Sequence, residues 1–251
     1  MELLYGRHAV AESLCAGRRR FQRILIGQGV QRTGIIEEIA RLAMRSGCAV
    51  GEGQRQFFQG FGEVNHQGVV AEVSDYPYVE VETLLGGRAA EEEPLFLVLD
   101  HLQDVQNLGT LLRTAEAMGV NGVLIPGRRA AGITPAVVNA SAGAVEHLRV
   151  ALVGNLVQSL LELKRNGIWV VGLEAVESSV PLTRADLSGP LALVVGSEGA
   201  GLARLVRERC DWLLSIPMYG RVSSLNAAVA GSVVLVAARQ ARDRRWPQAS
   251  T

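Results

Sequence analysis

The feature that most constrains the fold is a series of short, continuously apolar segments in the C-terminal part of the chain. These segments are LFLVLD (95–100), GVLIP (122–126), IWVVGLEA (168–175), LALVVG (191–196) and LLSIP (213–217). Stretches with helical periodicity, such as 107–118, separate several of them. Strands that are apolar along their whole length are typical of a parallel sheet that helices cover on both faces. We therefore predict an α/β fold with a parallel sheet in this region.

A smaller α/β pattern precedes this region. Helix-like segments at 9–14 and 34–44 alternate with strand-like segments at 23–27 and 68–73. The segment 75–93 then combines two glycines, an acidic run and flanking prolines, a composition typical of a connection. We expect four parts: an N-terminal domain at 1–74, a linker at 75–93, a larger domain at 94–242 and a C-terminal tail at 243–251.

The composition excludes several classes of protein. The 25 Lys and Arg residues balance 25 Asp and Glu residues, which argues against a protein that coats nucleic acid along its whole surface. No apolar run approaches the roughly 20 residues that a membrane helix needs. No signal peptide is recognisable, and Cys15, Cys48 and Cys210 fit neither a disulfide framework nor a zinc motif. We expect a cytoplasmic protein with no membrane partner, and the spacing of the four histidines predicts no metal site.

Basic side chains of the N-terminal region are candidates for contacts with a nucleic acid. Arg18, Arg19, Arg20 and Arg23 form a cluster that could bind phosphates without regard to sequence. A solvated protein face explains the same cluster equally well. The same two alternatives stay open for Arg7 and His66.

Three loops of the larger domain are candidates for a ligand site, because an open parallel sheet binds ligands beyond the carboxyl ends of its strands. The first loop follows residues 95–100 and leads into a helix with Asn107 at its expected N-cap. Arg113 lies off the apolar stripe of that helix. A capped helix with a solvated arginine explains both residues as well as a functional role does.

The second and third loops carry more polar chemistry. GSEGAG (196–201) is a glycine-rich turn whose backbone can approach a ligand closely, although its glycines are not in the order of a dinucleotide-binding motif. Glu198 lies inside this turn. In the third loop, Ser223 or Ser224 could cap the last helix, but capping does not account for Arg221, Ser224 and Asn226 together.

In order and spacing, the segments NLGTLLRTAEAMG, LVVGSEGAGL and IPMYGRVSSLNAAVAG resemble the three motifs of the SpoU (TrmH-type) family of RNA ribose 2′-O-methyltransferases. YGRHAVAESL and NHQGVVAEV resemble the substrate-binding domain of the subfamily that methylates a guanosine of 23S ribosomal RNA. The resemblance covers nearly the whole chain except the linker and the last ten residues. Val105 departs from the pattern, since many members carry proline there, and we expect only a small change in loop rigidity.

The resemblance implies a SPOUT-type trefoil knot in the C-terminal domain, a rare feature among folds. It implies S-adenosylmethionine as the cofactor, bound by Gly196, Ile216 and Leu225, a ribosomal RNA substrate and a homodimer. It also implies a catalytic set, in which Arg113 clamps the phosphate next to the reacting 2′-hydroxyl. The other members of this set orient Arg113, the ribose and the loops: Asn107, Glu198, Ser224 and Asn226.

Three alternative functions stay open at this point. The enzyme could act on transfer RNA or on an adenosine of ribosomal RNA. The chain could be a non-catalytic RNA-binding relative, which the retained Arg113, Glu198 and Asn226 disfavour. A nucleotide-dependent oxidoreductase is disfavoured by the order of the glycines and by the lack of an acidic residue at the usual distance.

Overall fold

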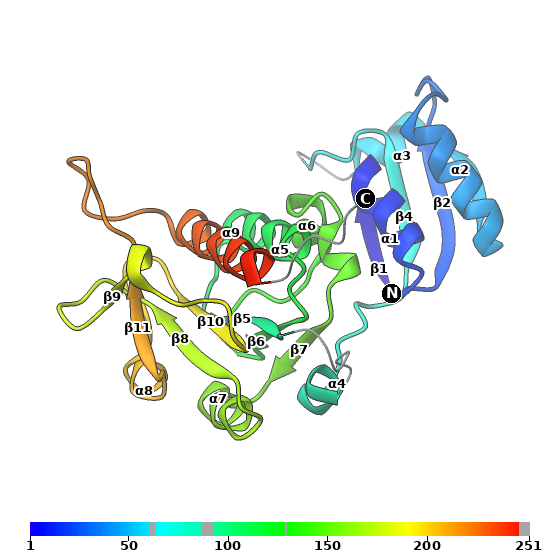
Figure 1. The fold of residues 1–251 in the computed structure, drawn as a ribbon. Helices are drawn as coiled ribbons and strands as arrows, with labels where there is room; N and C mark the ends of the chain where they lie inside the picture. The colour runs from blue at the N-terminus through cyan, green and yellow to red at the C-terminus, as the bar shows by residue number, and fades with distance from the viewer. Residues whose placement is uncertain (61–63, 87–92, 129, 246–251) are drawn as a thin grey trace. The chain divides into compact units, whose positions relative to one another are not determined.

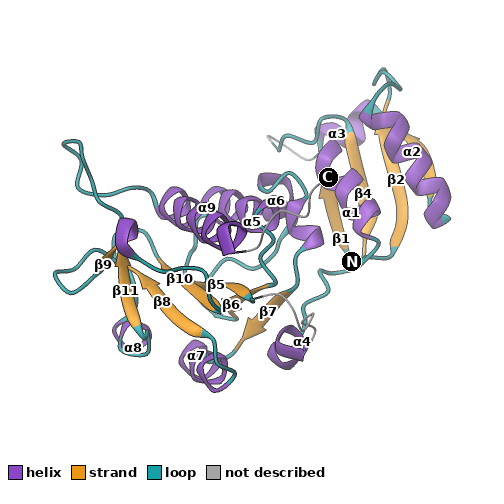
Figure 2. Cartoon of the chain, viewed as in Figure 1, coloured by secondary structure: helices purple, strands orange, loops and turns teal. Residues whose placement is uncertain are grey.

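The computed structural model describes residues 1–60, 64–86, 93–128 and 130–245, and within it the chain forms two compact units. The first unit contains residues 1–77 together with 133–147, and the second contains 78–132 and 148–251. Figure 1 shows the elements of both units, and Figure 2 shows their helices and strands by type. The expected boundaries at 74, 93 and 242 stay a prediction. The structure adds that the segment 133–147, from the middle of the larger domain's sequence, packs within the N-terminal unit.

The N-terminal unit is built on a four-stranded mixed sheet in the order β1-β4-β2-β3. Strand β4 runs antiparallel to β1 and β2, and β3 runs parallel to β2. The elements of this unit are β1 (Glu2–Tyr5), α1 (Arg7–Ala16), β2 (Phe21–Gly27), α2 (Ile35–Ser46), β3 (Ala49–Gly53), α3 (Arg55–Gln59), β4 (Val69–Val73), α6 (Pro135–Ala140) and the 3-10 helix η1 (Ala144–His147).

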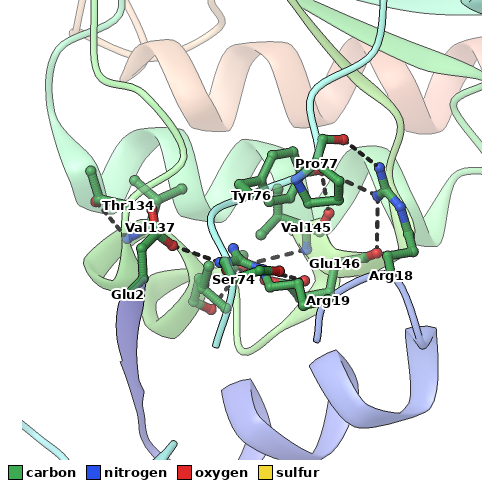
Figure 3. Close-up of polar contacts among 12 residues, drawn as sticks. Glu2, Arg18, Arg19, Ser74, Tyr76, Pro77, Thr134, Val137, Val145 and Glu146 are labelled. Carbon is green, nitrogen blue, oxygen red and sulfur yellow. Dashed lines mark hydrogen bonds and ion pairs between the residues drawn. The ribbon is translucent and has the colours of Figure 1, made fainter. Parts of the chain in front are cut away.

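A buried ion-pair network joins η1 to the rest of this unit (Figure 3). The side chains of Arg19 and Glu146 are fully buried, with Arg19 Nη2 2.8 Å from Glu146 Oε1, and Arg19 Nη1 lies 2.6 Å from Glu2 Oε2. Arg18 donates to the Glu146 and Pro77 carbonyls at 3.1 and 3.0 Å. Burial raises the pKa of Glu146, and the charge of Arg19 opposes that shift.

This network changes the interpretation of the arginine cluster in the sequence. Arg19 is 5% exposed, Arg18 is half-buried and bonded to backbone carbonyls, and Arg23 forms an ion pair with Glu72. Neither of the two alternatives, phosphate binding or a solvated face, describes the whole cluster, because acidic and carbonyl oxygens of the protein already bind three of its four guanidinium groups. Arg20 stays exposed.

The second unit contains a seven-stranded parallel sheet in the order β7-β6-β5-β10-β8-β11-β9. This sheet confirms the predicted α/β class and its parallel strands. The elements of this unit are α4 (Val81–Gly86), β5 (Leu95–Asp100), α5 (Val105–Ala117), β6 (Gly122–Pro126), β7 (Val150–Val153), α7 (Leu156–Arg165), β8 (Trp169–Leu173), β9 (Val180–Pro181), the 3-10 helix η2 (Leu182–Arg184), β10 (Leu191–Gly196), α8 (Arg204–Arg207), β11 (Trp212–Ser215) and α9 (Ala227–Arg245).

Helices cover both faces of this sheet (Figure 1). Helices α5 and α9 pack together on one face, and α4, α7 and α8 lie on the other. Alternate residues of the strands face these two layers, so that Phe96, Val98 and Val194 pack towards Leu160 of α7. Burial on both faces explains why β10 is apolar at every position and β5 at every position before its last residue, Asp100.

Helix α9 packs unusually close to the sheet and to α5. A Cβ atom at Gly231 would lie 2.9 Å from a methyl carbon of Leu111 and 3.2 Å from one of Val195. Glycine at this position of the helix is therefore what allows the close packing. The close approach fixes the beginning of α9 next to the end of β10, where the polar loops meet.

The segment 75–93, expected as a linker, has more structure than its composition indicates. Tyr76 is buried, and its hydroxyl donates to the Val145 carbonyl at 3.0 Å. Leu84 and Leu85 of α4 are also buried. The Glu91 and Glu92 part of the acidic run lies outside the described residues.

Candidate active site

The carboxyl ends of β8, β10 and β11 open into a pocket of about 660 Å³. Six of the eight residues predicted for the site line this pocket. They are Gly196, Glu198, Ile216, Ser224, Leu225 and Asn226. The pocket lies where an open parallel sheet binds its ligands, and all its lining residues belong to the second unit.

Three polar side chains from the three predicted loops meet at the edge of this pocket. Asn107 Nδ2 donates to Glu198 Oε1, and Asn226 Nδ2 lies 3.0 Å from both Glu198 Oε1 and Asn107 Oδ1. Glu198 therefore accepts from both amides. The triad consisting of Asn107, Glu198 and Asn226 joins loops that are 28 to 119 residues apart in the sequence.

The caps of the two helices differ from the expectation. Asp104 caps α5 by accepting from the Asn107 amide at 2.8 Å, so Asn107 lies in the first turn with its side chain free to join the triad. Asn226 caps α9, since its Oδ1 accepts from the Ala228 and Val229 amides at 2.9 and 3.2 Å. The alternatives of Asn107 or a serine of the third loop as cap are therefore wrong.

The glycine-rich turn closes on itself beside β10. Ser197 donates its amide to the Gly201 carbonyl at 3.1 Å, and Gly201 donates back to the Ser197 carbonyl at 3.0 Å. A Cβ atom at Gly196 would lie only 2.4 Å from the backbone of Gly201. A side chain at this position would push the turn away from the strand, so the sequence needs glycine there.

A second carboxylate, Glu174, lines the pocket at the end of β8. Both of its oxygens accept from Arg207, and the charge and hydrogen bonds of Glu174 raise the pKa of that arginine. The pairing with Arg207 holds the carboxylate in place next to Gly201. Sequence reasoning missed Glu174, although its place directly after an apolar strand was a usable signal.

Arg113 is the predicted catalytic residue that the structure keeps apart from the pocket. It lies on α5, its side chain is exposed, and it is not among the residues that line the pocket. No hydrogen bond or ion pair of its guanidinium is found within the described part of the chain. None of the residues that the structure describes therefore neutralises this charge, which is available to an external anion.

The described residues contain no group of three or more His, Cys, Asp or Glu side chains that could hold a metal ion. None of the helices in the described ranges is long and apolar enough to cross a membrane. Cys15, Cys48 and Cys210 are all free thiols. The chemistry of the site is that of backbone amides, carboxamides, two carboxylates and one exposed arginine.

Comparison with known proteins agrees with this arrangement. The sequence profile of the SpoU rRNA Methylase family matches residues 94–236, and the profile for RNA 2′-O ribose methyltransferase substrate binding matches residues 3–79. The protein YacO of Bacillus subtilis, assigned to the TrmH family of tRNA/rRNA methyltransferases, is 42% identical over 237 residues, which cover 93% of each chain. A TrmH family relative in Staphylococcus aureus is 41% identical over 235 residues, again 93% of each chain.

Solved structures give the same result. The SpoU methyltransferase AviRb of Streptomyces viridochromogenes, crystallised with AdoMet, superposes with a TM-score of 0.78 at 25% identity and covers 96% of this chain and 90% of its own. The AdoMet-bound rRNA methyltransferase of Sinorhizobium meliloti superposes with a TM-score of 0.76 at 26% identity, covering 95% and 87%. The chain therefore belongs to the SpoU rRNA methylase family, and it is an RNA methyltransferase.

Proposed function

We propose that this enzyme transfers a methyl group from S-adenosylmethionine to a ribose 2′-hydroxyl of ribosomal RNA, with a guanosine of 23S rRNA as the target. The observation that carries the proposal is the Asn107–Glu198–Asn226 triad beside a pocket lined by Gly196, Ile216 and Leu225. A family profile for RNA 2′-O ribose methyltransferase substrate binding over residues 3–79 supports the RNA substrate. With this substrate, the proposal places the enzyme in the cytoplasm.

The pocket fits the cofactor in size and in chemistry. Ligand pockets have volumes of about 300–1,000 Å³, and this one, at about 660 Å³, lies inside that range. The close approach of Gly196 to Gly201 leaves backbone groups of the turn exposed to a ligand. S-adenosylmethionine supplies a methyl group on a positively charged sulfur, which an oxygen nucleophile can attack in line.

The residues of the chain orient the reacting groups. The triad holds the first turn of α5, the glycine-rich turn and the beginning of α9 in one arrangement, which reduces the entropy lost when substrate and cofactor meet. Ser224 lines the same pocket, next to Leu225. Together these side chains position the loops rather than exchange protons.

Arg113 supplies the electrostatic part of the mechanism. A guanidinium resists deprotonation and is therefore a poor base, but it binds a phosphate with two parallel hydrogen bonds. We assign Arg113 to the phosphate next to the target ribose, where its charge lowers the pKa of the 2′-hydroxyl. The proton then leaves through a phosphate oxygen, a water molecule or the carboxylate of the cofactor.

Two measurements test the proposal. Isothermal titration should show binding of S-adenosylmethionine and none of NAD. Mapping of 2′-O-methyl groups in RNA from a strain that lacks the gene should show one missing site in 23S rRNA. If the missing methyl group lies in a transfer RNA or on an adenosine, the proposed substrate is wrong and the proposed reaction, ribose 2′-O-methylation, stands.

A further inference from the structure

One edge of the N-terminal sheet carries three loops whose described residues contain no acidic side chain. The loop 28–34 follows β2, the loop 64–68 precedes β4, and the segment 54–60, which contains the short helix α3 and is counted with the loops here, follows β3. Because β2 and β3 are parallel and β4 is antiparallel to β2, all three loops meet at the same edge of the sheet. We call these three loops the loop edge.

Short contacts hold the loop edge together as one surface. Gln28 donates its amide to the Gly53 carbonyl at 3.2 Å, and Gly27 donates to the Gly68 carbonyl at 2.9 Å. A Cβ atom at Gly68 would lie 2.5 Å from a methyl carbon of Val30, so the loops 28–34 and 64–68 are in direct contact. The surface is therefore preorganised.

The described residues of the loop edge carry positive charge that no other described residue neutralises. Arg32 and Arg55 are both exposed, and neither forms a hydrogen bond or ion pair with any residue that the structure describes. The opposite edge of the same sheet behaves differently, since Arg19 pairs with Glu2 and Glu146, and Arg23 pairs with Glu72. Of these two edges, the loop edge is the one that offers a pair of arginines to which no described residue is bonded.

The remaining side chains of the loop edge are suited to bases. Phe57 is 36% exposed and packs edge-on against the buried Phe58, with ring centroids 5.5 Å apart, while Phe58 also contacts the ring of His66 at 5.0 Å. An exposed ring on a fixed support is a platform on which an unpaired base can stack. Carboxamide groups, which can pair with base edges, are frequent in the three loops: Gln28, Gln31, Gln54, Gln56, Gln59, Asn65 and Gln67.

We propose that the loop edge binds an unpaired, looped-out segment of the RNA substrate. Arg32 and Arg55 contact its phosphates, Phe57 stacks on a base, and the carboxamides read base edges. Unpaired nucleotides fit this surface better than a duplex does, because sequence-specific recognition of RNA uses bases that are splayed out of the helix. The proposal rests on the proposed function for the presence of an RNA substrate, and it adds where that RNA is held.

The test compares two variants of the full-length enzyme with equal loss of charge. One is Arg32→Gln/Arg55→Gln at the loop edge, and its matched control is Arg20→Gln/Arg23→Gln at the opposite edge. The probe is 23S rRNA from a strain that lacks the gene, and the measurements are the RNA dissociation constant at several salt concentrations, KM and kcat for methyl transfer, and S-adenosylmethionine affinity.

We expect the loop-edge variant to weaken RNA binding and raise KM by about tenfold or more, with kcat and cofactor affinity unchanged. The slope of log K against log salt should fall in magnitude by about 1.4, since each phosphate contact with a single strand contributes about 0.7. The control variant should change each value less than twofold. Phe57→Ala should weaken RNA binding by about tenfold without changing the salt slope, because stacking involves no counterion release.

The two possible failures can be told apart. If the wild-type enzyme binds and methylates the RNA and the loop-edge variant matches the control, the inference about the loop edge is overturned and the proposed function stands. If the wild-type enzyme methylates no RNA, the proposed function fails. The RNA dissociation constants of the two variants still test whether the loop edge binds RNA. Absence of RNA binding by the wild-type protein overturns both.

Discussion

Arg113 is exposed on α5, and no described residue pairs with its guanidinium, so its replacement should affect catalysis far more than structure. We expect Arg113→Ala to lower the rate of methyl transfer by about 10²–10³, the usual contribution of an electrostatic donor in a transition state. S-adenosylmethionine affinity should stay within a few-fold, which isothermal titration can measure. Arg165→Ala, an exposed arginine of α7, is the control. A loss of cofactor binding as large as the loss of rate would refute the assignment of Arg113 to the RNA.

Replacement of Gly196 should have the opposite effect to replacement of Arg113, because it should weaken the binding of the cofactor directly. A Cβ atom there would meet the backbone of Gly201 at 2.4 Å, and backbone cannot move aside as a flexible side chain can. We expect Gly196→Ala to displace the glycine-rich turn and to weaken S-adenosylmethionine binding by tenfold or more, which corresponds to about 1.4 kcal/mol. Gly154→Ala is the control, since its Cβ would meet nothing within 4 Å. Equal affinities of the two variants would show that the turn does not hold the cofactor.

Among the elements, η1 carries the acidic partner of the fully buried ion pair between Arg19 and Glu146. We expect Arg19→Met to lower the free energy of unfolding by about 3–5 kcal/mol, because it leaves the Glu146 carboxylate buried without its partner. The double variant Arg19→Met/Glu146→Leu should recover most of this loss, since an apolar pair of similar volume can replace a buried ion pair. Urea denaturation at pH 7 measures the free energy of unfolding of the wild type, the single variant and the double variant. A double variant as unstable as Arg19→Met would contradict this account.

The pH dependence of the Arg19→Met variant follows from the direction of the Glu146 shift. Burial raises the pKa of this carboxyl above its unfolded value, so the folded state binds the proton more tightly than the unfolded state does. The variant lacks the Arg19 charge that opposes this shift, so it should lose stability relative to the wild type as the pH rises through the folded pKa, and regain it as the pH falls back towards the unfolded pKa. Urea denaturation of both proteins at a series of pH values measures this difference.

For the whole molecule, we predict a homodimer formed through residues 94–242. Val229, Val233 and Val236 of α9 are 46%, 39% and 38% exposed, and their spacing places them on one face of the helix. A contiguous apolar stripe on an exposed helix is typical of an interface. Light scattering at micromolar concentration should give twice the monomer mass, and Val229→Glu/Val233→Glu should give the monomer. A wild-type monomer with full activity would rule the dimer out.

The dimer also bears on the position of Arg113. One chain alone leaves this residue outside the pocket, and we expect the partner chain to lie close to each active site. The monomeric Val229→Glu/Val233→Glu variant should therefore lose methyl transfer while it retains its fold, measured by circular dichroism.

The packing of 133–147 with the N-terminal unit changes what a truncation should do. The boundaries expected from the sequence would make residues 94–251 a fragment that folds alone, dimerises and binds S-adenosylmethionine. In the structure, Val137, Val138, Val145 and Glu146 are buried within the N-terminal unit, so this fragment would expose three valines and separate Glu146 from Arg19. We now expect residues 78–251 to melt at least about 10 °C below the full chain, or to aggregate, by calorimetry and size exclusion. If residues 78–251 melt at the same temperature as the full chain, the larger domain folds independently of the N-terminal unit.

The sequence by itself determined the α/β class, the parallel sheet and the three loops of the site. Strands buried on both faces must be apolar at every position, and this constraint is visible in LFLVLD and LALVVG without any structure. The short strands β1, β3 and β7 were not predicted, because a segment of four or five residues is too short to show a clear periodicity. The trefoil knot stays an implication of the family, since chain threading leaves no mark on local periodicity.

Only the tertiary structure decided what individual polar residues do. Asn107 and Asn226 are equally good caps by composition, but Asp104 caps α5, and the packing of α9 against β10 brings both asparagines to Glu198. Arg19 and Arg32 are alike in sequence, yet one is buried against Glu146 and the other is exposed. A charged side chain is neutralised by partners that are distant in the chain, 127 residues away for Arg19. The sequence shows which charges exist, and only the fold shows which of them remain for the substrate.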